Sequence, residues 1–370
     1  MTGGGARPMA VYVLGMAVHP PSSRIADKRL EEMVFDVSRA ALDDAHVERN
    51  ELEHVTIAGS DELDGRSIAS MLLAMPAGAY LKDEIKCTDS GLTGLCLGAM
   101  RMTSGFGDLG VVVSWCKNST SDFDNVTASR AEPFYLRPIG MNDAIANGLF
   151  ANALTHDEGI TEDEATASVL AYRANAARNP RAIPRPLASP QELRDGPYVA
   201  APLRKGHQAP LTDGAAAFVL ATEAWLAKHP GAAPYARIAG LGWSVDSYAL
   251  GRTRLSALGS FRKSVDAALA RADATLDDID VVELDAQTGF HAAAYARALD
   301  GLACEPTAPS GGPFAQNPLF CTGLVHAAEA VLQVSGKAGP IQAPGARLAL
   351  AHGCYGYAQQ ANAVALFAGV

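Results

Sequence analysis

The residue types best suited to nucleophilic and acid–base chemistry stand at two places in the sequence. Cys87 comes just before a Ser-Gly pair at 90–91 that is typical of a helix start, where the helix dipole and free N–H groups favour a thiolate. His352 follows an apolar run, 348–351, that predicts a buried strand, and one glycine separates it from Cys354. Histidine titrates near neutral pH and suits proton transfer, whereas a thiolate is a strong nucleophile. The pattern predicts a site that combines a nucleophile with an acid or base.

Each of these residues also has a structural explanation. A cysteine at a helix start can simply be buried, because free cysteine is among the most buried residue types. Asp89, two residues after Cys87, would raise the pKa of a nearby thiol. Of His352 and Cys354, one could pack inward while the other is solvated. We expect at least one of these two to be functional, and the sequence leaves open which one.

An internal repeat organises the chain around these residues. An offset of 227 residues carries a helical pattern at 40–45 onto 267–272, and the strand pattern that follows it is repeated as well. An offset of 229 residues relates two Thr-Gly-Leu segments, at 93–95 and 322–324, each of which opens a helical stretch rich in small residues. Two nearly equal offsets indicate a duplication in which each half contains a helix feeding a buried strand.

The repeat divides the chain into two halves and an insertion. We expect residues 1–225 to form the first half and residues 226–370 the second. Within the first half, residues from about 117 to 210 carry aromatics, prolines and arginines together with apolar-periodic stretches, so they predict a loop-rich, partly helical insertion rather than a linker. A turn and an apolar run at 211–220 predict the buried strand that closes the first half.

Three further segments carry a family resemblance. They are a Thr-Asp-Gly-Ala-Ala-Ala strand entry at 212–217, a Ser-Gly-Gly-Pro…Asn-Pro…Thr-Gly stretch at 310–323 and a His-Gly-Cys-Tyr-Gly-Tyr-Ala run at 352–358. With the repeat, they resemble the thiolase superfamily over most of the chain, closest to the branch related to sterol-carrier-protein thiolases and their acyltransferase relatives. The resemblance implies an α/β fold in which duplicated βαβαβαββ halves, each with a five-stranded mixed sheet, stack as a five-layer αβαβα sandwich.

The resemblance implies a nucleophile at the start of the buried first-half helix. Family members carry Cys-x-Ser-Gly there, and an ungapped alignment places that cysteine on Thr88. Either the loop has one extra residue and Cys87 holds the acyl group, or the site has lost its thiolate.

The other expected site residues also depart from the family pattern. Asn317 stands where the family has the histidine of Gly-His-Pro, an oxyanion-hole donor; an amide can donate there but cannot exchange a proton near neutral pH. Asn317 also precedes a proline, which is typical of a turn. His352 and Cys354 correspond to the second acid/base, and in the His-Asp-x-Phe stretch only Asp285 matches plainly.

Composition narrows the classes of function. The chain has 40 acidic and 30 basic residues and a net charge of −10, which disfavours nucleic acid and anionic membranes as partners. No run reaches the ~18 apolar residues of a membrane helix, and the first eight residues lack the apolar stretch of a secretory signal. The six cysteines show no CxxC pair and no zinc spacing, so we expect reduced thiols, no metal and a cytoplasmic protein.

The resemblance to the thiolase superfamily implies an acyltransferase of Claisen type that joins or splits acyl-CoA thioesters through an acyl group on Cys87. Acyl-CoA would be a substrate, and no permanently bound cofactor is expected. Cations of the insertion could meet its phosphates or form a solvated face; they are Arg173, Arg178, Arg181, Arg185, Arg204 and Lys205.

Two alternatives remain open. One is an aldolase or retro-aldolase of the same fold that needs no acyl-cysteine. The other is a non-catalytic thiolase-like subunit that scaffolds a small partner with an OB-fold or a zinc site. The resemblance also implies a homodimer or a higher oligomer.

Overall fold

Strands and helices alternate along the chain. The computed structural model describes residues 10–88 and 90–370. Its strands are β1 (Val11–Val18), β2 (His54–Ala58), β3 (Asp83–Cys87), β4 (Leu109–Lys117), β5 (Tyr198–Ala200), β6 (Leu203–Arg204), β7 (Asp213–Thr222), β8 (Ala236–Val245), β9 (Val281–Glu283), β10 (Leu348–Tyr355) and β11 (Ala361–Ala368). Its α-helices are α1 (Leu30–Ala45), α2 (Ser70–Leu73), α3 (Gly91–Thr103), α4 (Phe123–Arg130), α5 (Asp143–Glu158), α6 (Glu162–Ala176), α7 (Pro190–Asp195), α8 (Glu223–Lys228), α9 (Arg252–Ala257), α10 (Gly259–Ala272), α11 (Gly289–Ala298) and α12 (Thr322–Val334).

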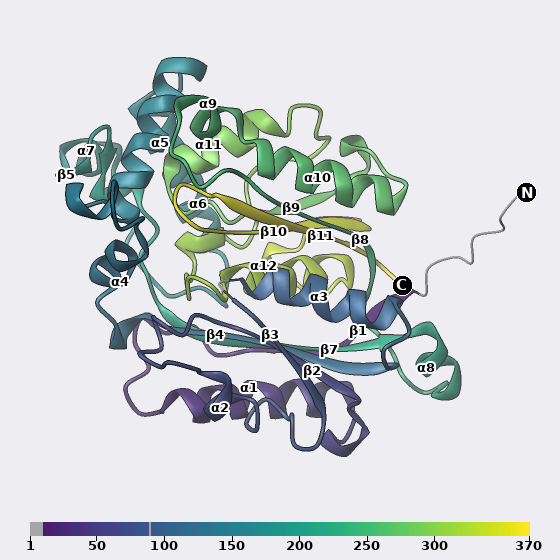
Figure 1. The fold of residues 1–370 in the computed structure, drawn as a ribbon. Helices are drawn as coiled ribbons and strands as arrows, with labels where there is room; N and C mark the ends of the chain where they lie inside the picture. The colour runs from purple at the N-terminus through teal and green to yellow at the C-terminus, as the bar shows by residue number, and fades with distance from the viewer. Residues whose placement is uncertain (1–9, 89) are drawn as a thin grey trace, which may run out of the picture.

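Five layers are visible in Figure 1. The helices α1 and α2 cover the outer face of the strands β1 to β4 and β7, and α10 covers the outer face of β8 to β11. The helices α3 and α12 lie between the two groups of strands, while α4 to α7 gather at one end of the sandwich. Because both faces of most strands are covered, they are buried along almost their whole length. The predicted five-layer α/β architecture is confirmed.

The strands repeat one pairing pattern. Within the described residues they run in the order β3-β2-β4-β7-β1-β8-β11-β10-β9. In the first group, β2 is parallel to β4, and β7 lies between β4 and β1 and is antiparallel to both. In the second group, β9 is parallel to β10, and β11 lies between β10 and β8 and is antiparallel to both. Among the described strands, the two groups pair with each other through β1 and β8, where Tyr12 and Val13 lie opposite Arg237 and Ala236. The pattern is the structural counterpart of the sequence duplication.

The second half differs from the expected five strands. Its described strands are the four from β8 to β11. Before α3 the first half forms β3, but the corresponding stretch before α12 is a 3₁₀ turn over Gly312–Phe314. Gly311 and Gly312 adopt positive φ angles of 87° and 52°, and Pro313 has no N–H to give to a ladder. This backbone chemistry replaces the fifth strand with a turn.

Small residues allow the middle helices to lie directly on the strands. A Cβ on Gly98 of α3 would lie 2.6 Å from the Cγ2 atom of Val112, and a Cβ on Gly323 of α12 would lie 3.0 Å from the Cα atom of Gly353. Every residue of α12 except Leu332 is buried. The stretches predicted from their small residues to be buried helices are therefore the middle layer of the sandwich.

The segment between β4 and β7 forms a helical wall rather than a linker. It contains α4 to α7 and the short hairpin of β5 and β6, and α6 packs against α11. The division of the chain at 225/226 stays a prediction, and this boundary falls inside α8. In the described part of the chain, no helix is both long and apolar enough to span a bilayer.

Candidate active site

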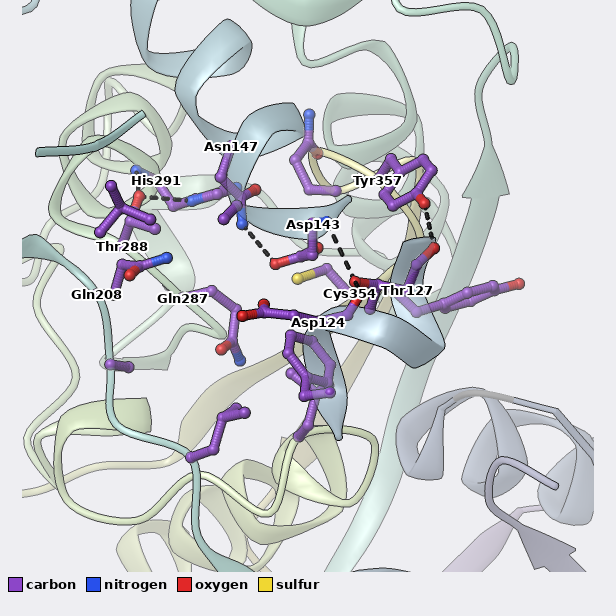
Figure 2. A pocket seen from close by; sticks show the side chains of 18 of the residues that line it. Asp124, Thr127, Asp143, Asn147, Gln208, Gln287, Thr288, His291, Cys354 and Tyr357 are labelled. Atoms are coloured by element: carbon purple, nitrogen blue, oxygen red, sulfur yellow. Dashed lines mark hydrogen bonds between the residues drawn. The ribbon is translucent and has the colours of Figure 1, made fainter. Parts of the chain in front are cut away.

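A cavity of about 960 Å³ opens where the helical wall meets the ends of the strands. Its lining comes from α4, α5 and the segment 193–211, from the residues after β9, and from the turn between β10 and β11. Thr88 and Phe320 line it from the N-terminal ends of α3 and α12. Figure 2 shows the polar side chains that line it, which include Asp124, Thr127, Asp143, Asn147, Gln208, Gln287, Thr288, His291, Cys354 and Tyr357.

Thr88, rather than Cys87, faces this cavity. The Ser90 hydroxyl accepts a hydrogen bond from the Thr93 N–H at 3.2 Å and caps α3, so the Ser-Gly pair starts the helix. Cys87 ends β3, is 8% exposed, and directs its thiol to the carbonyl oxygens of Thr88 and Ser90 at 3.7 and 3.9 Å. Carbonyl oxygens accept a proton from a thiol and repel a thiolate. Asp89 lies outside the described residues.

His352 lies inside β10, because this strand continues beyond the apolar run 348–351. The ladder between β10 and β11 continues to Tyr355. The His352 Nδ1 atom accepts the Asp285 N–H at 3.2 Å, and its Nε2–H donates to Oδ1 of Asn362 at 2.8 Å. The ring is fully buried, and burial lowers the pKa of His352 to about 3. A neutral ring with both nitrogens engaged positions the backbone around Asp285.

Asn317 is fully buried behind Gln287. Its Nδ2 atom donates to Oε1 of Gln287 at 2.8 Å, and its Oδ1 atom accepts from Thr322 Oγ1 at 2.8 Å and from Gln287 Nε2 at 3.1 Å. The Asn317 N–H donates to Oγ1 of Thr212 at 2.9 Å. Because these contacts occupy the amide, Asn317 holds Gln287 at the cavity wall and does not line the cavity itself.

Cys354 is the predicted site residue that lines the cavity. Its N–H donates to Oδ2 of Asp285 at 3.0 Å, and its thiol lies 3.6 Å from the Asp285 carbonyl oxygen. Burial, followed by the charge of Asp285, raises the pKa of the Cys354 thiol well above its ordinary value. Burial also raises the pKa of Asp285 to about 7. At neutral pH Cys354 is therefore a neutral thiol beside a partly protonated carboxyl group.

Asp143 gives the cavity a carboxyl group suited to accepting a proton. It is the first residue of α5, which Asn142 caps by accepting the Ile145 N–H at 2.9 Å. One turn later, Nδ2 of Asn147 donates to Oδ2 of Asp143 at 2.8 Å. Burial, with a smaller contribution from the charge of Asp124, raises the pKa of Asp143 to about 6. A carboxylate with a pKa near the working pH is an effective general base.

Known proteins share this architecture. No family model matches the chain. A curated relative, the acetyl-CoA acetyltransferase of Methanothermobacter thermautotrophicus, is 24% identical over 353 residues, which cover 88% of this chain and 91% of the relative. Human mitochondrial 3-ketoacyl-CoA thiolase superposes with a TM-score of 0.79 at 16% identity, covering 99% of this chain and 100% of its own. The structure described as the Ltp2-ChsH2(DUF35) aldolase superposes with a TM-score of 0.80 at 18% identity, covering 98% of this chain and 99% of its own. The chain has the thiolase fold.

The resemblance to the thiolase superfamily is thus confirmed at the level of the fold. Sequence reasoning missed several polar residues that this thiolase fold brings to the cavity, among them Asp143, Asn147 and His291. The first two did leave a signal in the sequence. They stand four residues apart on a helix whose other inward residues, such as Phe150 and Leu154, are apolar. A polar pair at that spacing on a buried face marks a site.

Burial raises the thiol pKa of the other four cysteines of this thiolase fold, which are Cys96, Cys116, Cys304 and Cys321. All six cysteines are described, and none of them forms a disulfide. Burial raises the pKa of both Cys96 and Cys321 to about 12, so neither is a thiolate at neutral pH. Among the described residues, no three His, Cys, Asp or Glu side chains are grouped so that they could hold a metal ion.

Proposed function

We propose that this protein breaks or forms a carbon–carbon bond beside an acyl thioester by aldol-type chemistry, with Asp143 as the general base and without an acyl-cysteine. One observation carries the proposal: the cavity contains a carboxyl group of pKa about 6, while Thr88, on which an ungapped alignment places the thiolase nucleophile, lines it in place of Cys87. This proposal and the acyltransferase predicted from the sequence both act on an acyl thioester. They differ in whether a cysteine thiol holds the acyl group during the reaction.

The cleavage direction needs only one proton to be moved. The Asp143 carboxylate removes the proton of a hydroxyl group on the carbon β to the thioester carbonyl. The oxygen forms a C=O bond, the bond between Cα and Cβ breaks, and its electrons pass into the thioester as an enolate. Protonated Asp143 returns the proton to Cα. The products are a shorter acyl thioester and an aldehyde or ketone, and no oxidant or reductant is required.

The ends of α3 and α12 support the enolate intermediate. Each helix has 13 residues, and their N-terminal ends meet the cavity through Thr88 and Phe320. The N-terminus of a helix carries a partial positive charge. Several N–H groups here already have acceptors, such as that of Gly91, which donates to the Phe320 carbonyl oxygen at 2.8 Å, so the helix dipole carries this argument. A positive potential that is already in place at a developing oxyanion lowers the barrier without reorganisation. This placement can stabilise the negative charge that the cleavage step puts on the thioester oxygen.

Two cations on the helical wall suit the phosphates of coenzyme A. Arg173 and Lys205 line the cavity. By contrast, Arg181 pairs with Glu329 and Arg204 pairs with Glu162, so these two arginines already have partners. We therefore assign phosphate contact to Arg173 and Lys205, since guanidinium and ammonium groups both bind phosphate.

Acyl transfer is the second candidate, because Cys354 lines the cavity and the curated relative is named an acetyltransferase. Incubation with acetyl-CoA followed by intact mass measurement separates the two. Under aldol-type chemistry we expect no acetyl adduct in the wild type. An adduct that disappears in Cys354→Ala or in Cys87→Ala would establish acyl transfer through that thiol and overturn the proposal.

A second copy of the chain is a suitable partner for β3, the strand at the edge of the first-half group of strands. β3 is an edge strand, and exposed apolar side chains surround it: Leu81 is 86% exposed, Met71 78% and Ile85 37%. Such an edge pairs readily with another strand. We expect light scattering after gel filtration to find a dimer, and the double variant Leu81→Lys and Ile85→Lys to be monomeric. Leu187→Lys, at a remote residue that is 62% exposed, should remain a dimer. A monomeric wild type would contradict this assignment.

An accessory subunit remains a proposal as well. Phe134, Tyr135 and Ile139 are 79%, 80% and 68% exposed in the stretch between α4 and α5, which forms part of the wall around the cavity. The description of the Ltp2-ChsH2(DUF35) structure names a partner for that aldolase. Full turnover by this chain alone would exclude both the need for such a subunit and a purely scaffolding role. A cytoplasmic location stays a prediction.

A further inference from the structure

One side of the cavity carries polar side chains that the proposed reaction does not use. In Figure 2, Gln208, Thr288 and His291 lie on the side away from Cys354. An isolated β-bridge joins Gln208 to Thr288, so the segment before β7 runs beside the start of α11. Asn147 of α5 lies next to this group, because Phe150, one turn further along the same helix, stacks on the His291 ring at 4.4 Å.

The His291 ring is a fixed, neutral hydrogen-bond donor. The Thr288 hydroxyl accepts the His291 N–H at 3.3 Å and lies 2.8 Å from Nδ1 of the same residue. The proton of the Thr288 hydroxyl has no other acceptor among the described residues, so we assign this hydroxyl as the donor to Nδ1 of His291. The proton of the His291 ring is then on Nε2. His291 is 1% exposed, and burial lowers its pKa to about 3. Nε2 of His291 has no hydrogen-bond partner in the described protein, and it is not among the unpaired atoms that are fully buried. Because His291 lines the cavity, the Nε2–H faces it.

Two amides complete the group. Asn147 is 6% exposed and uses Nδ2 on Asp143, and its Oδ1 atom has no hydrogen-bond partner among the described residues. The side-chain amide of Gln208 lines the cavity and is likewise unpaired within the described part of the chain. The group therefore offers an N–H donor from His291, an acceptor from Asn147 and both kinds of group from Gln208, with no positive charge.

We propose that His291, Asn147 and Gln208 form a second binding subsite, which recognises an uncharged keto or hydroxyl oxygen carried by the acyl chain beyond the reacting carbons. This inference rests on the proposed thioester chemistry and names the class of acyl group. A purely apolar chain would leave three desolvated polar groups unpaired, which opposes binding. A carboxylate would find no cation among these three side chains and would meet the charge of Asp143. A keto oxygen accepts from the His291 N–H and from the amide N–H of Gln208, and a hydroxyl group can in addition donate to Oδ1 of Asn147.

Calorimetric titration with unreactive thioesters tests this subsite. Hexanoyl-CoA and octanoyl-CoA are compared with derivatives that carry a keto or a hydroxyl group on the penultimate carbon; none has the β-hydroxyl group that cleavage needs. We expect at least one oxygenated thioester to bind the wild type about tenfold more tightly than its parent. His291→Gln, whose amide nitrogen lies near the place of Nε2, should keep this preference. His291→Asn, whose amide nitrogen lies near the place of Nδ1, should lose it.

The possible outcomes separate the subsite from the proposed function. If the parent thioesters bind and oxygenation brings no gain, the subsite is wrong and thioester recognition stands. If no thioester binds, the proposed function fails and the subsite falls with it. A preference that survives in His291→Asn, or disappears in both variants while they remain folded, would also overturn the assignment. Asn147→Leu provides an independent variant if the buried His291 tolerates no substitution, and it should reduce the same preference.

Discussion

Replacing Asp143 with asparagine is expected to lower kcat/KM for cleavage of a β-hydroxyacyl-CoA by ~10²–10⁴-fold, the usual contribution of a general base. The amide keeps the size of the side chain but cannot accept the hydroxyl proton. Mass spectrometry of the shorter acyl-CoA and the released carbonyl compound measures the rate. Because only the ionised carboxylate is a base and its pKa is about 6, the wild-type kcat/KM should fall as the pH drops below that value.

Two controls make this result specific to Asp143. Cys87→Ala should retain the wild-type rate, because its thiol faces backbone carbonyl oxygens and does not line the cavity formed by the described residues. Thermal unfolding should show Asp143→Asn to be as folded as the wild type. A variant that retains full activity and the same pH profile would remove Asp143 from the mechanism. Loss of activity in Cys87→Ala would return the acyl-cysteine to it.

Replacing Arg181 with methionine is expected to lower the free energy of unfolding by about 3–5 kcal/mol, because it leaves a buried charge without its partner. Arg181 donates to both carboxylate oxygens of Glu329, at 2.9 and 2.6 Å, and Glu329 is 4% exposed. Glu283 is buried nearby; burial and the charge of Glu329 raise the pKa of Glu283 to about 8. Urea unfolding followed by circular dichroism measures the change. Arg178→Met, at an exposed arginine, should stay within about 0.5 kcal/mol of the wild type.

The pH dependence of stability checks the same carboxyl cluster. Folding raises the pKa of Glu283, so the native state binds more protons than the unfolded state between the ordinary value of 4.5 and about 8. The stability that Glu283 contributes is therefore complete below this window and is lost as the pH rises through it. The penalty of Arg181→Met should be larger at about pH 9 than at about pH 6, because Glu283, whose pKa is about 8, is then ionised as well. A penalty that does not change with pH would contradict this account.

The architecture could be predicted because local patterns report it directly. Helices covered on every side tolerate few polar residues, so the small residues of α3 and α12 marked them as buried. The missing fifth strand of the second half was also visible in principle, because Pro313 and its two preceding glycines stand where that strand would run. The family pattern implies a fifth strand there, whereas the local backbone chemistry favours a turn.

The site could be predicted only in part, because its geometry depends on register and on distant packing. The choice between Cys87 and Thr88 turns on a single residue of register, and which of the two lines the cavity depends on how the loop between β3 and α3 folds. The fate of His352 depends on how far β10 pairs with β11, a contact between separate strands. Asp143 and His291 belong to helices far apart in the chain, and no local pattern indicates that they share a cavity.

The buried middle layer also has an evolutionary consequence. In the present fold, α3 and α12 pack against each other. In a half-length ancestor with one sheet and one such helix, the apolar face of that helix would be exposed to water. Pairing with an identical chain would cover that face, and the repeated strand pattern of the two halves matches such a dimer joined into one chain. Once both halves belong to one chain, two residues at equivalent positions can change independently of each other. Thr88 and Asn317, which the 229-residue offset relates, could then diverge, one to face the cavity and the other to brace it.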